Sequence, residues 1–182
     1  HGRSVQKARI PQRVSIHQRP ELINQRQEFG HWEGDTIEGK RSEGDGIHTE
    51  VERQSRFLLA RKVDRIASPE TIRVQLRIFR GLPDATRQST TVDNGREHHR
   101  HMTLRFLGMT TYFCDPYSSW QRGTNENTNG LVRHYLPKGS SFRDLSQEDL
   151  DDIVEELNDR PRKCLRYNTP KEEFEKQLQC CT

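Results

Sequence analysis

Residues 31 to 63 have the sequence HWEGDTIEGKRSEGDGIHTEVERQSRFLLARKV. Runs rich in β-branched and aromatic residues predict three strands in and around this stretch, over Phe29–Ile37, Ile47–Val51 and Phe57–Val63. The glycine-rich segment GKRSEGDG, residues 39–46, predicts a hairpin connection between the first two strands. The fold is therefore expected to begin with hairpin-linked strands.

Helices and strands alternate after this stretch. A serine followed by Pro69 and Glu70 predicts a helix that begins with Ser68 as its N-cap. The elements expected next are a strand over Ser89–Val92, a helix over His98–Leu107 ended by Gly108, a strand over Thr110–Cys114, a helix capped by Ser146, and a last helix opened by a capping box at Thr169. Hairpin-linked strands followed by alternating elements predict an α/β fold, a mixed five-stranded sheet flanked by helices.

Length and composition indicate one domain with a small core. The chain has 182 residues, of which 30% are hydrophobic and 31% charged, so most of its surface must be polar. No stretch approaches the ~20 apolar residues that cross a bilayer, and no signal-peptide pattern opens the sequence. None of the four cysteines forms a CxxC pair, which argues against a zinc site or a disulfide framework. We expect a reduced, cytoplasmic protein that does not associate with membranes.

The basic charge is concentrated at the N-terminus. Residues 1–28 carry six Lys/Arg and two Glu, and because the whole chain has a net charge of +3, the remaining 154 residues carry −1. Two prolines and little hydrophobic periodicity predict an extended arm that contacts nucleic acid through residues such as Arg9 and Arg13. A solvated linker is the alternative. We therefore divide the chain into an arm or linker, 1–28, and a globular domain, 29–182.

Three carboxylates have unusual positions. Asp35 lies in a predicted strand, where Asp is disfavoured, so it needs a partner or an ion unless it faces solvent at an edge. Asp93 precedes Asn94-Gly95; this pattern fits a hairpin turn or the carboxyl end of a strand, where sites of α/β proteins collect. Glu126 lies in SSWQRGTNENTNGLVRHY, residues 118 to 135, and falls in the first turn of a helix if Thr124 is the cap. Together they could converge on a hard cation such as Mg²⁺, which prefers oxygen ligands.

The histidines of HHRH, His98, His99 and His101, offer a second possible metal site. Imidazoles at this spacing could bind a transition metal. The exposed surface of a helix is the reading that we favour.

Five stretches together resemble a known family. They are HWEGDTIEGK, VERQSRFLLARKV, TVDNGRE, YFCDPYSSWQRGTNENTNGLVRHYLPKGSSF and LNDRPRKCLRYNTPKEEF. These stretches closely resemble the catalytic domain of IS-thirty family insertion-sequence transposases, and the resemblance covers about residues 9 to 178. The 31-residue block that begins at Tyr112 is highly specific.

The resemblance implies a ribonuclease-H-like fold for residues 29–182 and DDE transposition chemistry, with Asp35, Asp93 and Glu126 as the acidic triad. It implies two Mg²⁺ ions, for which Mn²⁺ can substitute, and in-line phosphoryl transfer that cleaves transposon ends and joins them to target DNA. Amide variants of the triad are expected to lose this activity without loss of stability, since clustered like charges repel.

The resemblance also implies partners and supporting residues. We expect transposon-end and target DNA as partners, a homo-oligomer on DNA, and association with the nucleoid. Cations are expected to contact phosphates, asparagines to shape the site by hydrogen bonds, and an exposed aromatic residue to stack on unpaired bases unless it packs in the core or an interface. The cations are Arg122, Arg133 and Lys138; the asparagines are Asn94, Asn125, Asn127 and Asn129; and the aromatic residue is Trp120.

The chain also departs from the family pattern. His48 and Glu50 stand in a strand that is usually more apolar, His98 replaces an aromatic residue, and Arg166 replaces a common glycine. The family's upstream helix-turn-helix region has no counterpart in these 182 residues. Two alternatives therefore stay open: a catalytically inactive DNA-binding or dimerisation relic of a transposase, and a ribonuclease-H-like nuclease that cuts without joining.

Overall fold

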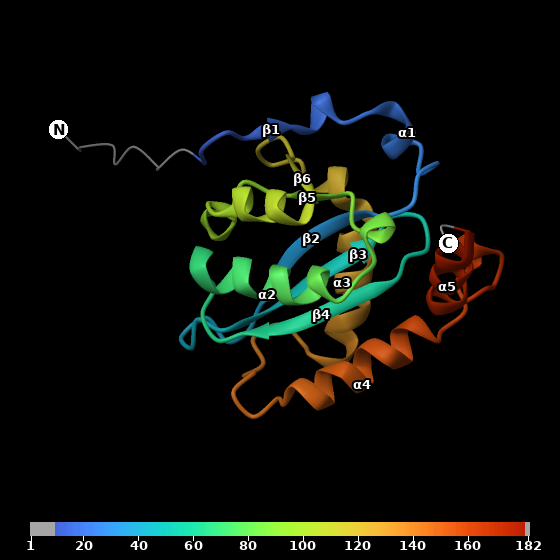
Figure 1. The fold of residues 1–182 in the computed structure, drawn as a ribbon. Helices are drawn as coiled ribbons and strands as arrows, with labels where there is room; N and C mark the ends of the chain where they lie inside the picture. Colours follow the sequence, from blue (N-terminus) through green and yellow to red (C-terminus); the bar gives the residue numbers. More distant parts are fainter. Residues whose placement is uncertain (1–9, 181–182) are drawn as a thin grey trace.

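One mixed sheet of six strands organises the computed structural model, which describes residues 10–180 (Figure 1). Its order is β1-β6-β5-β2-β3-β4; β2, β3 and β4 are antiparallel neighbours, whereas β5, β6 and β1 continue the sheet in parallel from β2. The strands are β1 (Val14–Ser15), β2 (His31–Glu38), β3 (Gly46–Glu52), β4 (Leu58–Val63), β5 (Ser89–Val92) and β6 (Thr110–Phe113). The five predicted strands are confirmed to within two residues at each end; β1 makes a sixth, which was not predicted.

Helices cover both faces of the sheet (Figure 1). The α-helices are α1 (Glu21–Asn24), α2 (Ser68–Arg80), α3 (Gly123–Tyr135), α4 (Gln147–Asn158) and α5 (Pro170–Cys180). Short 3₁₀ helices connect them: η1 (Ile16–Gln18), η2 (Asp84–Thr86), η3 (Arg96–His98), η4 (His101–Leu107), η5 (Ser119–Arg122) and η6 (Lys163–Leu165). None of the helices in residues 10–180 combines the length and the apolar character that a bilayer crossing requires.

The alternation of side chains along the strands separates two cores. Ile37, Ile47 and Val51 pack against α3 and α4, whereas Trp32 of β2 packs with residues of α2 on the opposite face. Asp35 has the same parity as Ile37 along β2 and therefore points to the face that α3 covers.

The predicted helix starts were confirmed in part. Ser146 and Asp149 form the capping box of α4, and Thr169 exchanges hydrogen bonds with Glu172 at the start of α5. The prediction that Ser68 is the cap of α2 was wrong. Ser68 is the first helical residue, and its hydroxyl accepts a hydrogen bond from the backbone N–H of Arg100.

The predicted helix over 98–107 consists of two 3₁₀ segments, η3 and η4, and ends at Gly108 with φ 75°, as expected. The buried residues here are His98, His101 and Leu104, which follow one another at intervals of three. A 3₁₀ helix has three residues per turn, so this spacing favours it over an α-helix. The prediction of an exposed histidine surface was therefore wrong for His98 and His101.

Residues 10–28 are packed rather than extended. Ile16 and Ile23 are buried, β1 pairs with β6, and the buried Arg19 donates a 2.9 Å hydrogen bond to Thr91 of β5. Two isolated isoleucines and a buried arginine carry no periodic signal, which is why the sequence suggested a free arm. Residues 1–9, including Arg9, lie outside the described residues.

The outer edge of β4 is covered by side-chain amides of α4. Asn158 donates to the carbonyl of Leu58 and accepts from its N–H, both at 2.9 Å. Gln147, at the other end of α4, accepts from the N–H of Lys62 at 3.0 Å and donates to the carbonyl of Ala60 at 3.4 Å. These four contacts occupy backbone groups that would otherwise be free at a sheet edge.

Comparison of two truncations tests the packing of residues 10–28. A chain lacking residues 1–28 should have a free energy of unfolding at least about 3 kcal/mol lower than a chain lacking only residues 1–9, because burial of each isoleucine stabilises by about 1.5–3 kcal/mol. Chemical denaturation measures the difference. Equal midpoints for the two truncations would contradict this account.

Candidate active site

Two of the three carboxylates meet across one guanidinium. Asp35 lies in β2, and Asp93 directly follows β5, the parallel neighbour of β2. Arg122 lies between them, with Nη1 3.1 Å from Oδ1 of Asp35 and Nη2 3.7 Å from Oδ2 of Asp93. The chain continues from Asp93 into η3, so the expected position at a strand end is confirmed and the hairpin alternative is wrong.

Arg122 is a buried cation. Its side chain is 7% exposed, and its Nη1 also donates a 2.9 Å hydrogen bond to the carbonyl of Gly34. Burial lowers the pKa of the guanidinium, but the charges of Asp35 and Asp93 outweigh burial and raise the pKa above its usual value. The side chain expected to contact phosphate is therefore engaged by the two carboxylates.

Glu126 lies in the first turn of α3, as expected. The prediction that Thr124 caps this helix was wrong, because α3 begins at Gly123 and the Thr124 hydroxyl accepts hydrogen bonds from arginines instead. Glu126 is four residues after Arg122 and three before Asn129, and both of these contact Asp35. Residues at these spacings share one flank of a helix, so Glu126 is on the flank of α3 that faces Asp35. Its carboxylate is exposed and has no hydrogen bond or ion pair within residues 10–180.

A buried carboxylate fixes the start of α3 on the sheet. Glu33 of β2 is 1% exposed and accepts the backbone N–H of Asn125 at 2.9 Å and Nε of Arg53 at 2.9 Å. The side-chain amide of Asn125 also donates to the carbonyl of Glu33 at 2.7 Å. Asp35 lies two residues beyond Glu33 on the same face of β2, so these bonds set the position of α3 relative to Asp35.

The expected asparagines have different surroundings. Asn129 donates to Oδ2 of Asp35 at 3.1 Å and to Oδ1 of Asn125 at 2.7 Å, and so it orients the Asp35 carboxylate. Asn94 joins the ends of β5 and β6 through a 2.7 Å hydrogen bond to the carbonyl of Cys114. Asn127 is exposed on the other flank of α3.

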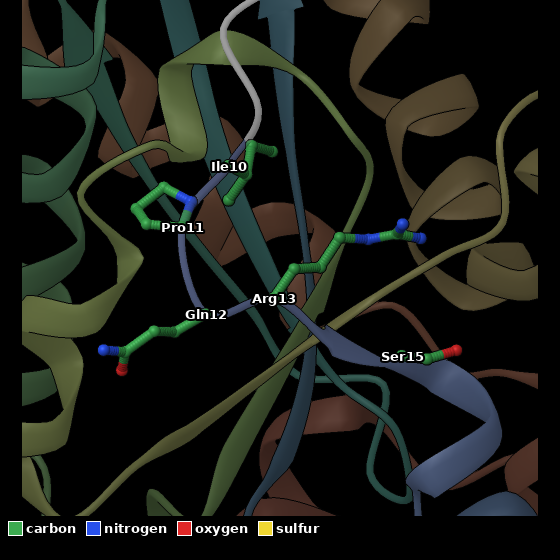
Figure 2. Close-up of a pocket in the computed structure, with 5 residues that line it drawn as sticks. All are labelled: Ile10, Pro11, Gln12, Arg13 and Ser15. Carbon is green, nitrogen blue, oxygen red and sulfur yellow. The ribbon is translucent and has the colours of Figure 1, made fainter.

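The expected DNA-contacting cations are also spread over the surface. Arg133 donates to the carbonyl of Glu38 at 2.8 Å, and Lys138 is exposed. Arg13 donates to the carbonyl of Cys114 at 2.9 Å beside a cavity of about 440 Å³, and Figure 2 shows its side chain and that of Gln12 extending to opposite sides of the backbone.

Trp120 is 71% exposed in η5. The same segment borders a cavity of about 690 Å³ at the ends of β5 and β6, whose lining includes Asp93, Asn94, Tyr117 and Arg122. Tyr117 is 98% exposed. The exposure of Trp120 excludes packing in the core, one of the two alternatives to base stacking.

Glu97 and His98 lie beside Asp93; no role was expected for Glu97, and His98 was considered as a ligand only within the separate HHRH stretch. Ligand atoms of Asp93, Glu97 and His98 lie within 4.8 Å of one another. Burial, with the charges of Asp93 and Asp35, raises the pKa of Glu97. Burial lowers the pKa of His98 to about 3, so this imidazole is neutral at pH 7. The sequence feature that could have indicated Glu97 is its position at the end of TVDNGRE, four residues after Asp93.

Three departures from the family pattern form one buried cluster behind Asp93. Nε2 of His48 lies 2.8 Å from Oε1 of Glu50, and the rings of His48 and His98 are 6.3 Å apart. Gln75 and Thr90 donate to the Glu50 carboxylate at 2.9 and 2.7 Å. The unusual polar residues of β3 are thus hydrogen-bonded and are compatible with a stable fold.

The donor set fits a hard divalent cation. Asp35, Asp93 and Glu126 offer only carboxylate oxygens, the ligands that Mg²⁺ and Mn²⁺ prefer. The guanidinium between Asp35 and Asp93 shows that positive charge is stabilised at this position. Within residues 10–180, the ligand atoms that lie within 4.8 Å of one another belong to Asp93, Glu97 and His98, whereas Asp35 and Asp93 are bridged by Arg122.

The fold defines the general class. The chain superposes on the catalytic core domain of BIV integrase with a TM-score of 0.65 and 19% identity, over 83% of this chain and 97% of that one. The chain therefore has the integrase catalytic-core fold, a ribonuclease-H-like α/β fold. No protein-family model matches it.

Two curated transposases are similar to the chain in sequence. The chain is 45% identical over 165 residues to the transposase for insertion sequence element IS1086 of Cupriavidus metallidurans, which is 90% of this chain and 48% of that protein. It is 42% identical over 165 residues to the transposase InsI for insertion sequence element IS30A of Escherichia coli, which is 88% of this chain and 42% of that protein. The chain is a homologue of the IS-thirty family transposases and spans about half the length of the curated relatives that it matches.

Substitution of Arg122 tests its position between the carboxylates. The change Arg122→Gln should lower the free energy of unfolding without divalent cation by about 1–3 kcal/mol, because it removes charged hydrogen bonds in a buried place. It should also increase the rise in melting temperature on addition of Mn²⁺, since the metal no longer competes with a guanidinium.

Arg96→Gln is the matched control, because Arg96 is exposed and carries the same charge three residues from Asp93. Thermal denaturation with and without Mn²⁺ measures both effects. Equal Mn²⁺ shifts in the wild type and the Arg122→Gln variant would show that Arg122 does not occupy the position of the ion.

Proposed function

We propose that this chain is the catalytic domain of a DDE-type DNA transposase, a polynucleotidyl transferase in which Asp35, Asp93 and Glu126 form the acidic triad. The observation that carries the proposal is the approach of Asp35 and Asp93 to one guanidinium, beneath the helix that bears Glu126. Similarity to insertion-sequence transposases supports the same activity. The reaction is cleavage at transposon ends followed by strand transfer to target DNA.

The side chains of the chain would position the reacting groups. When bound, two Mg²⁺ ions, or Mn²⁺ in their place, supply activation of the attacking hydroxyl and stabilisation of the leaving oxygen in an in-line displacement at phosphorus. Asp35, Asp93 and Glu126 would hold them. Asn129 orients the Asp35 carboxylate, and the bonds between Glu33 and Asn125 keep α3 in place. This chemistry requires no nucleophilic side chain.

The remaining assignments concern DNA. Arg133, Lys138, Arg9 and Arg13 would contact phosphates, and the exposed Trp120 would stack on unpaired bases beside the carboxylates. We expect the chain to act on DNA as a homo-oligomer at the nucleoid.

Amide substitution tests the triad. Asp35→Asn, Asp93→Asn and Glu126→Gln should each reduce cleavage and strand transfer to less than about a hundredth of the wild-type rate, because each metal role contributes several kcal/mol. A gel assay with pre-cut and uncut transposon ends measures both steps. Asp64→Asn, an exposed carboxylate on the connection from β4 to α2, is the control and should keep full activity.

The outcomes separate the alternatives. Cleavage without joining by the wild type would identify a nuclease, and DNA binding without either step would identify an inactive relic. The structure also changes the expected stabilities: Asp35→Asn should destabilise the metal-free protein because it leaves Arg122 with one carboxylate fewer, whereas Glu126→Gln should not.

Metal exchange provides a further test. Mg²⁺ or Mn²⁺ should support both steps, whereas Zn²⁺, which prefers nitrogen and sulfur ligands, should substitute poorly. Removal of divalent cations with EDTA should abolish both steps. Strand transfer at the full rate in EDTA would exclude the proposed mechanism.

A further inference from the structure

A basic cavity lies on the flank of α3 that faces away from Asp35. It has a volume of about 360 Å³, and its lining includes Arg26, Arg56, Thr124, Asn127, Arg162 and Cys164. Thr124 and Asn127 are three residues apart and share one flank of the helix, whereas Arg122, Glu126 and Asn129 share the other. The cavity and the carboxylates thus flank the same helical turn.

Two arginines converge on one hydroxyl in this cavity. Nη1 of Arg26 and Nη1 of Arg56 both donate to Oγ1 of Thr124, at 2.7 and 2.8 Å. Burial and the neighbouring charges of Arg56 and Arg53 lower the pKa of Arg26 to about 10. Two like charges held beside one neutral oxygen repel each other, and an anion between them would remove the repulsion.

The arginines of the cavity have no carboxylate partner. Neither Arg26 nor Arg56 nor Arg162 forms an ion pair with any residue in the described part of the chain; Arg162 donates to the carbonyl of Leu157. The Nε of Arg56 is buried without a hydrogen-bond partner. All three side chains are half-buried, and Nη1 of Arg26 also donates to the carbonyl of Arg53 at 2.7 Å. Their hydrogen-bond partners are thus neutral oxygens, whereas guanidinium groups bond most strongly to anions, so the cavity offers a place for an anionic partner.

The backbone at both arginines is one that glycine adopts more readily. Arg26 has φ 57° in the turn that ends α1, and Arg56 has φ 66° in the turn from β3 to β4. A glycine would hold either position with less strain. The backbone alone therefore does not favour arginine at these two positions, and strained residues of this kind cluster at binding sites.

We propose that this cavity binds a phosphate group of the DNA backbone, on the strand whose reacting bond lies at the carboxylates. The assignment rests on the proposed function. Guanidinium forks match the oxygens of phosphate, and the positive end of the α3 dipole lies at the same turn. The width of a helix, about 10 Å, corresponds to about three nucleotides of one strand. One strand that crosses α3 can therefore contact the carboxylates and the cavity together.

Cys164 provides a direct readout of the cavity. Cys114 is buried, so a chain carrying Cys180→Ser and Cys181→Ser leaves Cys164 as the reactive thiol. We expect duplex DNA to slow alkylation of Cys164 in EDTA, where no chemistry occurs. A duplex with neutral methylphosphonate linkages should not slow it. The rate of Cys164 alkylation in millimolar inorganic phosphate shows whether a free anion enters the same cavity.

Matched arginine variants make the test specific. Arg56→Gly should raise the DNA concentration that gives half-maximal protection of Cys164 by about ten- to a hundredfold, as expected for the loss of a charged hydrogen-bond donor. It should not lower the melting temperature. Arg166→Gly removes the same charge from another left-handed position, φ 55°, whose side chain is exposed outside the cavity, and should keep the protection. Arg162→Gln should weaken protection as Arg56→Gly does, which keeps the test valid if Arg56→Gly is unstable.

The outcomes are distinct. Protection by duplex DNA that Arg56→Gly or Arg162→Gln reduces and Arg166→Gly preserves would support the site. Equal losses in all variants, no protection by duplex DNA, or protection by inorganic phosphate alone would overturn it. Normal protection in a wild-type chain that neither cleaves nor joins DNA would refute the proposed function and leave the phosphate site standing.

Discussion

The buried carboxylate of Glu33 is the constraint on which the site depends. A carboxylate with 1% exposure is unfavourable unless its oxygens are paired, and it has two main partners, Arg53 and the N–H of Asn125. Any shift of α3 along the sheet would break the bond to Asn125 and leave buried charge unpaired. Asp35 and Glu126 are each close in sequence to one end of this contact, so their relative position follows from it.

The N-terminal half of α3, together with Arg122 just before it, serves two surfaces at once. One flank contacts Asp35 through Arg122 and Asn129, and the other presents Thr124 to two arginines. The helix thus links the carboxylates to residues contributed by the turn after α1, the turn between β3 and β4, and the segment after α4. The packed N-terminal segment has a role in this arrangement, because it supplies Arg26.

Much of the fold could be predicted from the sequence. The five main strands and the starts of α4 and α5 depend on local patterns: runs of β-branched residues and capping residues three apart. Asp93 could be placed because parallel strands end at a common edge. In contrast, β1 has two residues and no pattern, and η4 follows a period of three that differs little from that of an α-helix over one or two turns.

The parts of the site that were not predicted depend on contacts between distant segments. Arg122 was expected at the surface, since nothing local indicates that its guanidinium fits between two strand ends. Thr124 has the chemistry of a cap, and only Arg26 and Arg56, 98 and 68 positions away, explain its actual partners. Arg166 is informative in the opposite sense: its φ of 55° gives a physical reason for the glycine that the family resemblance places there.

The amides of Asn158 and Gln147 along β4 also bear on how copies of the chain can associate. A bare strand edge invites a second molecule to extend the sheet, which leads to uncontrolled polymers. Within residues 10–180 the edge at β4 is occupied by these side chains, and the opposite edge, β1, is only two residues long. Neither edge is a template for strand addition. Any contact between copies of the chain would therefore use helices and loops rather than the edges of the sheet.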